Sequence, residues 1–405
     1  MSLEKEARNS YIVAVGRKVR RDGEEVAVDS EAARYQRNKL LLGIAETVLS
    51  WAVLLGSVLS GLTMHLEGLA TAACAHPYLS FLLFACLVGS VQLAAVFPLL
   101  LWRDFFLERR YGLCTQDFAK WLLEQAKGIT VAAMVAAPAL LLFFYLFRTL
   151  PTAWWAPYAV ATVVVSIGLT AVGPRLILPL FHRFHPIGDQ ELQERLSRLA
   201  SPLGVRVSEV LRFDLSRKSR KANAALVGMG RTRRIVVSDT LLDHFTPAEV
   251  ESVVAHELGH HAHGHLWKML AATAAQVTLG LWASAWLYDR LLSKGAGSPH
   301  GLASLPLLAC LFAAYQVFTS PVLRALSRRF EIEADLFALQ HGSNEAFRSA
   351  LERLGAMNMS DPDPHPVVEF LFYSHPSLRR RLKMAMRQVA PESRERLTHL
   401  PETEG

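Results

Sequence analysis

The sequence has little cysteine and little charge for its length. Four cysteines occur in 405 residues, and no two form a CxxC pair: Cys74, Cys86, Cys114 and Cys310. Their scatter excludes a disulfide framework and a cysteine-based zinc site. Charged residues make up 20% of the chain and hydrophobic residues 51%. This balance is too apolar for an ordinary soluble chain, and it predicts several membrane spans joined to a polar portion.

Six stretches contain the roughly 20 mostly apolar residues that a helix needs to cross a bilayer. They are about Leu40–Leu62, Tyr78–Leu101, Ile129–Leu150, Trp154–Phe181, Leu266–Leu291 and Ala303–Leu323. Pro174 and Pro179 predict a kink near the end of the fourth stretch, because proline interrupts helical hydrogen bonding.

The positions of Lys and Arg predict the orientation of these spans. Residues 1–39 contain nine of them, Trp102–Lys127 contain five, and Thr63–Pro77 contain none. Because basic residues accumulate on the cytoplasmic side, both chain ends should be cytoplasmic. The same distribution explains the formal charge of +7 without a nucleic-acid partner. The host membrane would be a bacterial inner membrane or, in a eukaryote, the endoplasmic reticulum.

The predicted organisation has five parts. They are a cytoplasmic segment (1–39), four spans (40–181), a first polar segment (182–265), a pair of spans (266–323) and a second polar segment (324–405). Two spans separate the polar segments, so both lie on one membrane face and can build one domain. Val210–Phe213 and Arg234–Ser238 read as short strands followed by helix, which predicts an α+β domain.

The first polar segment carries a metal-binding motif. Thr246, Pro247 and Glu249 predict a helix start, which leads into His256-Glu257-Leu258-Gly259-His260 and on into the fifth span. Residues four apart share a helix face, so both imidazoles can reach one ion while Glu257 holds a water. Zinc suits such a site because it accepts His nitrogens and carboxylates and leaves one position open.

The third ligand should come from elsewhere in the chain. His263 lies about 10.5 Å along the helix from His256, which is too far for one ion. A helix expected to begin just after the sixth span carries Glu331 and Asp335, four residues apart. Glu331 can bind zinc while Asp335 accepts a hydrogen bond from a ligand imidazole. Glu333 should face solvent. His261, His263 and His265 are expected to be solvated or interfacial, and a nickel- or copper-binding tract is an alternative for these histidines.

The residues resemble a known family. EVESVVAHELGH, followed 71 residues after His260 by FEIEAD, is similar to the membrane zinc peptidases that include the type I CAAX prenyl endopeptidase and HtpX. Five further segments favour the prenyl endopeptidase branch: YGLCTQDFAKW, LPLFHRFHPI, DLSRKSRKANA, RIVVSDTLL and SHPSLRRRL. The resemblance extends from about Ala33 to Leu382.

The resemblance implies a role for each matching residue. It implies one zinc ion (Zn2+) per chain, held by His256, His260 and Glu331, with Glu257 as the general base and Asp335 as the carboxylate that orients a ligand. It also implies that His375 and Arg381 lie near the oxyanion, and that Asn223 and Ala224 form a strand edge that pairs with substrate. Two features differ from the family: Ala225 stands where an aromatic residue usually follows Asn-Ala, and the additional N-terminal span of eukaryotic members has no counterpart.

These inferences predict an α-helical integral membrane protein with about six spans and a split α+β, zincin-like cytoplasmic metalloprotease domain. It would hydrolyse peptide bonds near the C-terminus of isoprenylated CAAX-type proteins or peptides. Quality control of membrane proteins, as in HtpX, is an alternative. A metal-binding transporter or sensor is an alternative from another class, but it would require ionisable residues deep in several spans. Only Glu46 and Arg175 are evident, near span ends.

Overall fold

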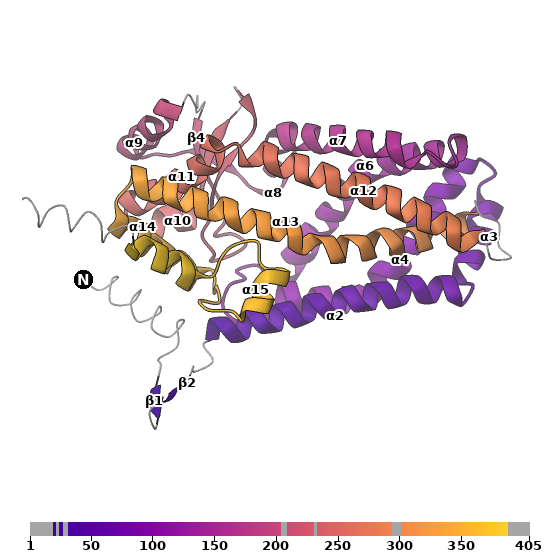
Figure 1. The fold of residues 1–405 in the computed structure, drawn as a ribbon, viewed down its shortest axis with the longest axis horizontal. Helices are drawn as coiled ribbons and strands as arrows, with labels where there is room; N and C mark the ends of the chain where they lie inside the picture. The colour runs from indigo at the N-terminus through magenta and orange to yellow at the C-terminus, as the bar shows by residue number, and fades with distance from the viewer. Residues whose placement is uncertain are drawn as a thin grey trace, which may run out of the picture.

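A computed structural model describes residues 19–21, 24–26, 31–203, 209–230, 233–293 and 301–387. Most of the predicted segment 1–39 lies outside these ranges; the described part includes β1 (Val19–Arg21), paired with β2 (Glu24–Val26). Figure 1 shows a long bundle of helices with a smaller mixed unit at one end. The two predicted polar segments meet in that unit.

Six helical segments of the described chain are long and apolar enough to span a membrane, as predicted. They are α2 (Glu31–Leu59), Pro77–Arg110, α6 (Phe118–Thr149), α7 (Trp155–Leu176), α12 (His265–Leu292) and Leu302–His341. The second comprises α4 (Pro77–Leu101), the π-helix η1 (Trp102–Phe106) and α5 (Leu107–Arg110). Large apolar side chains such as Phe318 and Leu59 point outward and are more than 75% exposed, as lipid-facing residues are.

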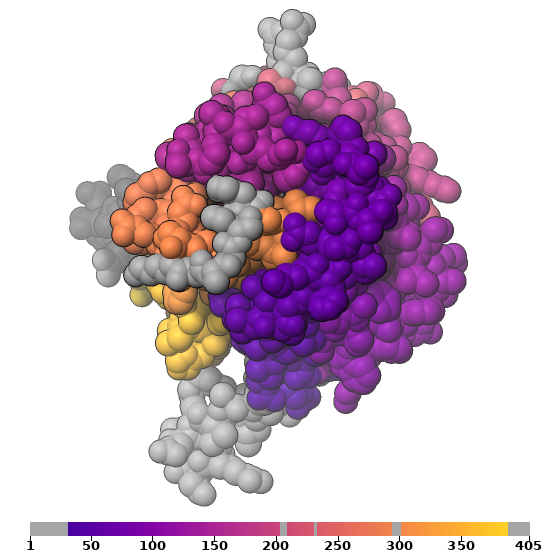
Figure 2. Space-filling model, turned by 90° about the vertical axis from the view of Figure 1, so that its right-hand side faces the viewer, coloured from indigo at the N-terminus to yellow at the C-terminus, as the bar shows by residue number. Residues whose placement is uncertain are grey.

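The six spans close a ring. In order around it, α2 packs on α4, α4 on α6, α6 on α7, α7 on α12, α12 on α13 (Leu305–His341), and α13 returns to α2. Figure 2 views the bundle from the end that carries α3 (Leu62–Ala73), with the indigo, magenta and orange helices on different sides. These six described spans therefore close the ring by themselves.

Two helix boundaries differ from the predictions. The FEIEAD motif does not begin a new helix, because α13 continues unbroken from the sixth span to His341. The HELGH helix does not run into the fifth span: α11 (Pro247–Ala262) ends before Gly264, whose φ of 64° is left-handed, and α12 starts at His265. A glycine adopts this conformation at little cost, so it permits the turn between the two helices. The predicted interruption near Pro174 and Pro179 is present, since α7 ends at Leu176 and α8 (Leu178–Phe181) follows.

The mixed unit is built on a four-stranded sheet of order β3-β4-β6-β5. The two predicted strands form its parallel centre, β4 (Glu209–Phe213) and β6 (Arg234–Ser238). Antiparallel strands flank them: β3 (Phe184–Pro186) beside β4, and β5 (Ala224–Val227) beside β6. Strand β5 lies at the sheet edge and packs against α11.

A common apolar core joins this sheet to its helices. Its fully buried side chains include Leu196 of α9 (Gln190–Ala200), Val237 of β6, Leu241 of α10 (Asp239–His244) and Leu258 of α11. Phe337 from α13 and Ala350 from α14 (Asn344–Met357) belong to the same core. The second polar segment is therefore part of the same hydrophobic unit as the first.

A charged cluster ties the membrane ring to this unit. Glu108 at the end of the second span forms ion pairs with Lys39 of α2 and, at 2.9 Å, with Lys221 just before β5. The hydroxyl of Tyr35 donates to the same carboxylate. One carboxylate thus joins two spans to the residues that enter the edge strand.

Removal of this carboxylate should destabilise the protein. Glu108→Ala leaves two partly buried ammonium groups without their shared partner, which should cost about 2–3 kcal/mol. We expect the thermal midpoint of the detergent-solubilised protein to fall by several degrees. Glu191→Ala removes an exposed partner of Arg195 and is the matched control, since such pairs contribute less than about 1 kcal/mol. Equal midpoints for the two variants would contradict the anchoring role of Glu108.

Candidate active site

The start of α11 is fixed by a reciprocal cap. The Thr246 hydroxyl accepts a hydrogen bond from the Glu249 N–H, and the Glu249 carboxylate accepts one from the Thr246 N–H at 2.7 Å. The other oxygen of this buried carboxylate binds Ser349 and Arg353 of α14. The predicted helix start is confirmed, and it also fixes α14 beside α11.

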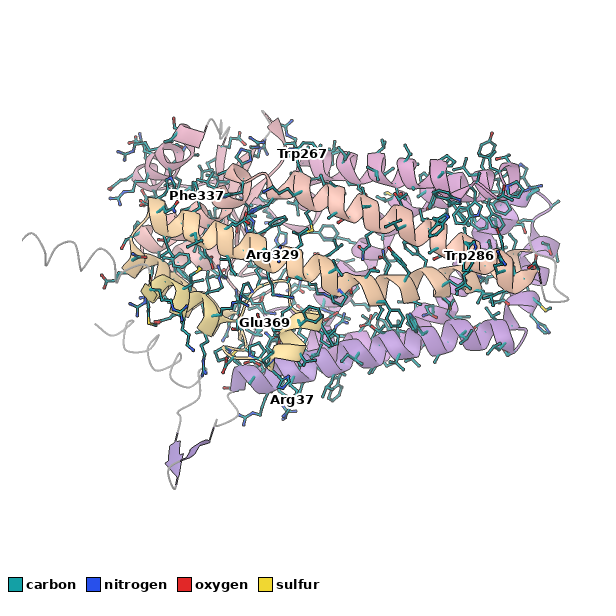
Figure 3. All side chains as sticks on the ribbon, in the orientation of Figure 1. Arg37, Trp267, Trp286, Arg329, Phe337 and Glu369 are labelled. Atoms are coloured by element: carbon teal, nitrogen blue, oxygen red, sulfur yellow. The ribbon has the colours of Figure 1, made fainter. Side chains whose placement is uncertain are left out.

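Gly259, inside the HELGH motif, lets α11 approach α13 closely. A Cβ atom at this position would lie 3.0 Å from the Cα of Ala334 and 3.0 Å from the Cβ of Phe337. Figure 3 labels Phe337, which lies at this crossing, and Arg329 further toward the sixth span on the same helix. The close approach brings the first carboxylate of FEIEAD within reach of both imidazoles.

Among the described residues, one group of three side chains can share an ion: His256, His260 and Glu331, here called the His–His–Glu cluster. The Nε2 atoms of the two imidazoles are 3.2 Å apart; that of His256 lies 3.4 Å from Oε2 of Glu331 and that of His260 lies 3.4 Å from Oε1. One donor atom from each residue lies within 4.8 Å of the others. Ligand atoms of a tetrahedral zinc with bonds of 2.0–2.1 Å are separated by roughly 3.3–3.4 Å. The donor types and their spacing therefore fit a zinc ion.

Asp335 orients His256 from behind the cluster. Its Oδ1 lies 2.8 Å from the Nδ1 of His256, and the side chain is fully buried. Burial disfavours the charged imidazolium, but the carboxylates of Asp335 and Glu331 outweigh it and raise the pKa of His256 to about 9. Both oxygens of Asp335 also accept hydrogen bonds from the guanidinium of Arg381. Arg381 therefore holds the carboxylate that orients His256.

His260 has a different partner behind it. Its Nδ1 lies 3.0 Å from the Nδ1 of His265, whose Nε2 lies 2.9 Å from the carboxylate of Glu333. The sequence-based prediction is therefore wrong for His265, which is buried, whereas the side chain of Glu333 is 43% accessible and also contacts His265. Periodicity along one continuous helix could not reveal the contact, because the break at Gly264 turns His265 back toward His260.

Glu257 faces a cavity of about 130 Å³ beside the cluster. Burial raises the pKa of its carboxyl above the usual range, although His256 and His260 oppose this shift, as does a hydrogen bond from the Leu226 backbone. A carboxyl with a raised pKa is suited to exchanging protons near neutral pH.

His375 and Arg381 line the same cavity, as do Asn223 and Ala224. The Nε2 of His375 lies 3.2 Å from Glu331, so this residue belongs to the site. Ala225 packs instead with the Leu211, Phe213 and Val236 cluster on the other face of the sheet. Residue 225 does not line the cavity, so the alanine that stands there in place of an aromatic residue does not alter the cavity wall.

Sequence reasoning did not identify Arg328 as part of the site. This buried guanidinium donates to the carbonyl oxygens of Glu369, Phe370 and Tyr373, at the end of α15 (Pro366–Phe372). In Figure 3 Glu369 lies beside α13, where these bonds form. Arg328 thereby fixes the chain that leads into His375. Arg328 lies one turn before Glu331 on the same helix, and this spacing could have indicated from the sequence that it lies near the site.

A second cavity, of about 420 Å³, adjoins the first and shares four lining residues with it: Leu351, Leu354, His375 and Arg381. Its other walls come from Gln36 of α2 and from residues 358–364 and 372–378. The site therefore extends from the cluster toward the start of the first span.

The fold and the cluster define an integral-membrane metallopeptidase. Residues 186–389 match the model of peptidase family M48, and residues 27–183 match the CAAX prenyl protease N-terminal region, described as five membrane helices. The chain belongs to peptidase family M48. The prediction of a membrane metalloendopeptidase of the CAAX prenyl endopeptidase branch is confirmed.

Several characterised and uncharacterised proteins are similar over most of their length. An uncharacterized metalloprotease of Bacillus subtilis, YhfN, is 27% identical and covers 89% of this chain and 86% of its own. CAAX prenyl protease 1 of Saccharomyces cerevisiae is 28% identical, and the match covers 74% of this chain and 71% of the yeast protein. The crystal structure of S. mikatae Ste24p matches with a TM-score of 0.80 at 24% identity, over 95% of this chain and 96% of that one. This last match shows the same fold.

Substitution of Gly259 should separate the two helices that carry the cluster. Gly259→Ala places a methyl group against Ala334 and Phe337, and such overpacking costs about 1–3 kcal/mol. We expect zinc affinity, measured by competition with a chromogenic chelator, to fall about tenfold or more. Gly128→Ala is the matched control, because a Cβ there meets nothing within 4 Å. Unchanged affinity in Gly259→Ala would show that the close approach is not required.

Proposed function

We propose that this protein is a zinc-dependent endopeptidase in which His256, His260 and Glu331 hold the metal and Glu257 is the general base. The observation that carries the proposal is the arrangement of the cluster: the two Nε2 atoms lie 3.2 Å apart, and each lies 3.4 Å from one of the two oxygens of Glu331, with one donor atom from each residue within 4.8 Å of the others. The buried carboxyl of Glu257 faces the same cavity. Three protein ligands leave a fourth position open, as in catalytic zinc sites.

Zinc, when bound, acidifies a water toward neutrality and polarises the scissile carbonyl. The chain supplies the proton transfers and the positioning. Glu257 accepts a proton from the attacking water and later delivers it to the leaving amine, a double role that its raised pKa favours. His375 lines the same cavity, with its Nε2 3.2 Å from Glu331, and would donate a hydrogen bond to the developing oxyanion. Arg381 adds positive charge there while it holds Asp335.

Substrate would bind in extended form along β5. An edge strand offers unpaired backbone groups, and Asn223 and Ala224 stand where this edge meets the cavity. Phe347, Leu351 and Leu354 of α14 form an apolar wall on the other side. An apolar substrate side chain next to the scissile bond fits this wall.

The proposed substrates are isoprenylated CAAX-type proteins or peptides, cut near the C-terminus. The similarity to CAAX prenyl protease 1 along both the membrane and the peptidase regions supports this choice. A lipid-modified peptide partitions into the bilayer, where the six spans would place this enzyme. The distribution of Lys and Arg supports a cytoplasmic catalytic unit.

The base assignment predicts a separation of metal binding from turnover. Glu257→Gln retains the size of the side chain but cannot accept a proton, so peptide cleavage should fall at least 100-fold. Zinc content, measured by atomic emission on the same sample, should remain at one per chain. Undiminished proteolysis by the pure variant would refute the role of Glu257.

The substrate assignment is tested by comparing two peptides of one sequence. A farnesylated CAAX peptide should be cleaved with a higher kcat/KM than its unprenylated form, because the lipid adds apolar surface that binds in or near the bilayer. Both are incubated with the detergent-solubilised protein, and products are identified by mass. Equal rates on both, together with cleavage of unfolded membrane proteins, would favour quality control.

A further inference from the structure

We propose that His265 and Glu333 form a positioning pair for His260, which fixes its ring and strengthens its hold on the metal. This inference rests on the proposed function, because it treats His260 as a ligand. It assigns a role to two residues that lie outside the His–His–Glu cluster and do not face the catalytic cavity.

The two nitrogens of His260 point to different partners. Its Nε2 faces His256 and Glu331, on the side where the ion would bind. Its Nδ1 lies 3.0 Å from the Nδ1 of His265. A neutral imidazole that offers Nε2 to a metal carries its proton on Nδ1, so His260 must donate this proton to His265.

The direction of the next hydrogen bond then follows. Since the Nδ1 of His265 accepts, its proton resides on Nε2, which lies 2.9 Å from Glu333 Oε2. His265 therefore donates to the carboxylate, and one chain of donors runs from His260 through His265 to Glu333. In this series of hydrogen bonds each ring nitrogen can act only as a donor or only as an acceptor, so each of the two rings has a single tautomer.

The surroundings of His265 hold it in this orientation. The side chain is buried, and its ring stacks on Phe330 with centroids 4.2 Å apart and planes inclined by 10°. The left-handed turn at Gly264 places it opposite His260 rather than further along the same helix. A preorganised partner of this kind restricts rotation of the ligand ring.

Helix α13 thereby supports both imidazoles. Glu331 completes the cluster, Asp335 lies 2.8 Å from Nδ1 of His256, and Glu333 supports His260 through His265. Partners of metal-bound histidines raise ligand basicity, and their loss typically lowers metal affinity 10- to 100-fold. Glu333 is partly exposed, with 43% of its side chain accessible, so it should contribute less to zinc affinity than His265 does.

Zinc affinity, measured by chelator competition on the full-length protein in detergent, tests the pair. We expect His265→Ala to weaken zinc binding 10- to 100-fold and Glu333→Ala several-fold. His265→Asn should recover part of the loss, because its amide oxygen can accept from His260 as Nδ1 does. His261→Ala is the matched control, since no hydrogen bond joins this neighbouring, more exposed histidine to His260 among the described contacts.

The outcomes separate this proposal from the function on which it rests. If wild type binds one zinc, but His265→Ala and Glu333→Ala bind it equally tightly, the pair has no positioning role. Equal losses for His265→Ala and His265→Asn would also overturn it, because loss of packing alone would then explain the effect. If Glu331→Ala binds zinc as tightly as wild type, the proposed ligand set fails instead.

Discussion

The structure depends on the contact between α11 and α13 at Gly259. One helix carries two imidazoles and the other a carboxylate, and neither contains a complete metal site. A glycine at the crossing brings the two backbones so close that one oxygen of Glu331 lies 3.4 Å from Nε2 of His256 and the other 3.4 Å from Nε2 of His260. The two polar segments of the chain, separated by a pair of spans, are joined at this point.

Buried charges around that contact are each matched by an opposite charge or a hydrogen bond. Arg381 neutralises Asp335, which orients His256, and Arg328 accommodates the carbonyl oxygens that precede His375. Glu108 neutralises Lys39 of the membrane ring and Lys221, which precedes the edge strand. A buried group without its partner would cost several kcal/mol, so these pairs fix the relative positions of ring, sheet and cavity.

The sequence allowed prediction of the spans and the central strands from local periodicity, and of the cluster from four-residue spacings on two separate helices, His256 with His260 and Glu331 with Asp335. It did not allow prediction of contacts created by backbone geometry. The turn at Gly264 directs His265 back toward His260, and it also brings His265 within 2.9 Å of Glu333, whose side chain remains 43% accessible. The edge strand β5 has four residues and lacks alternation, so resemblance alone indicated it.

Zinc content of the purified protein with and without the distant carboxylate tests the central claim most directly. Wild type and Glu331→Ala would be prepared in the same detergent, and bound zinc per chain measured by atomic emission after dialysis against a weak chelator. The account predicts one zinc per wild-type chain and little in the variant, while Glu251→Ala, on the same unit, retains one. Full zinc occupancy in Glu331→Ala would contradict a site completed from α13.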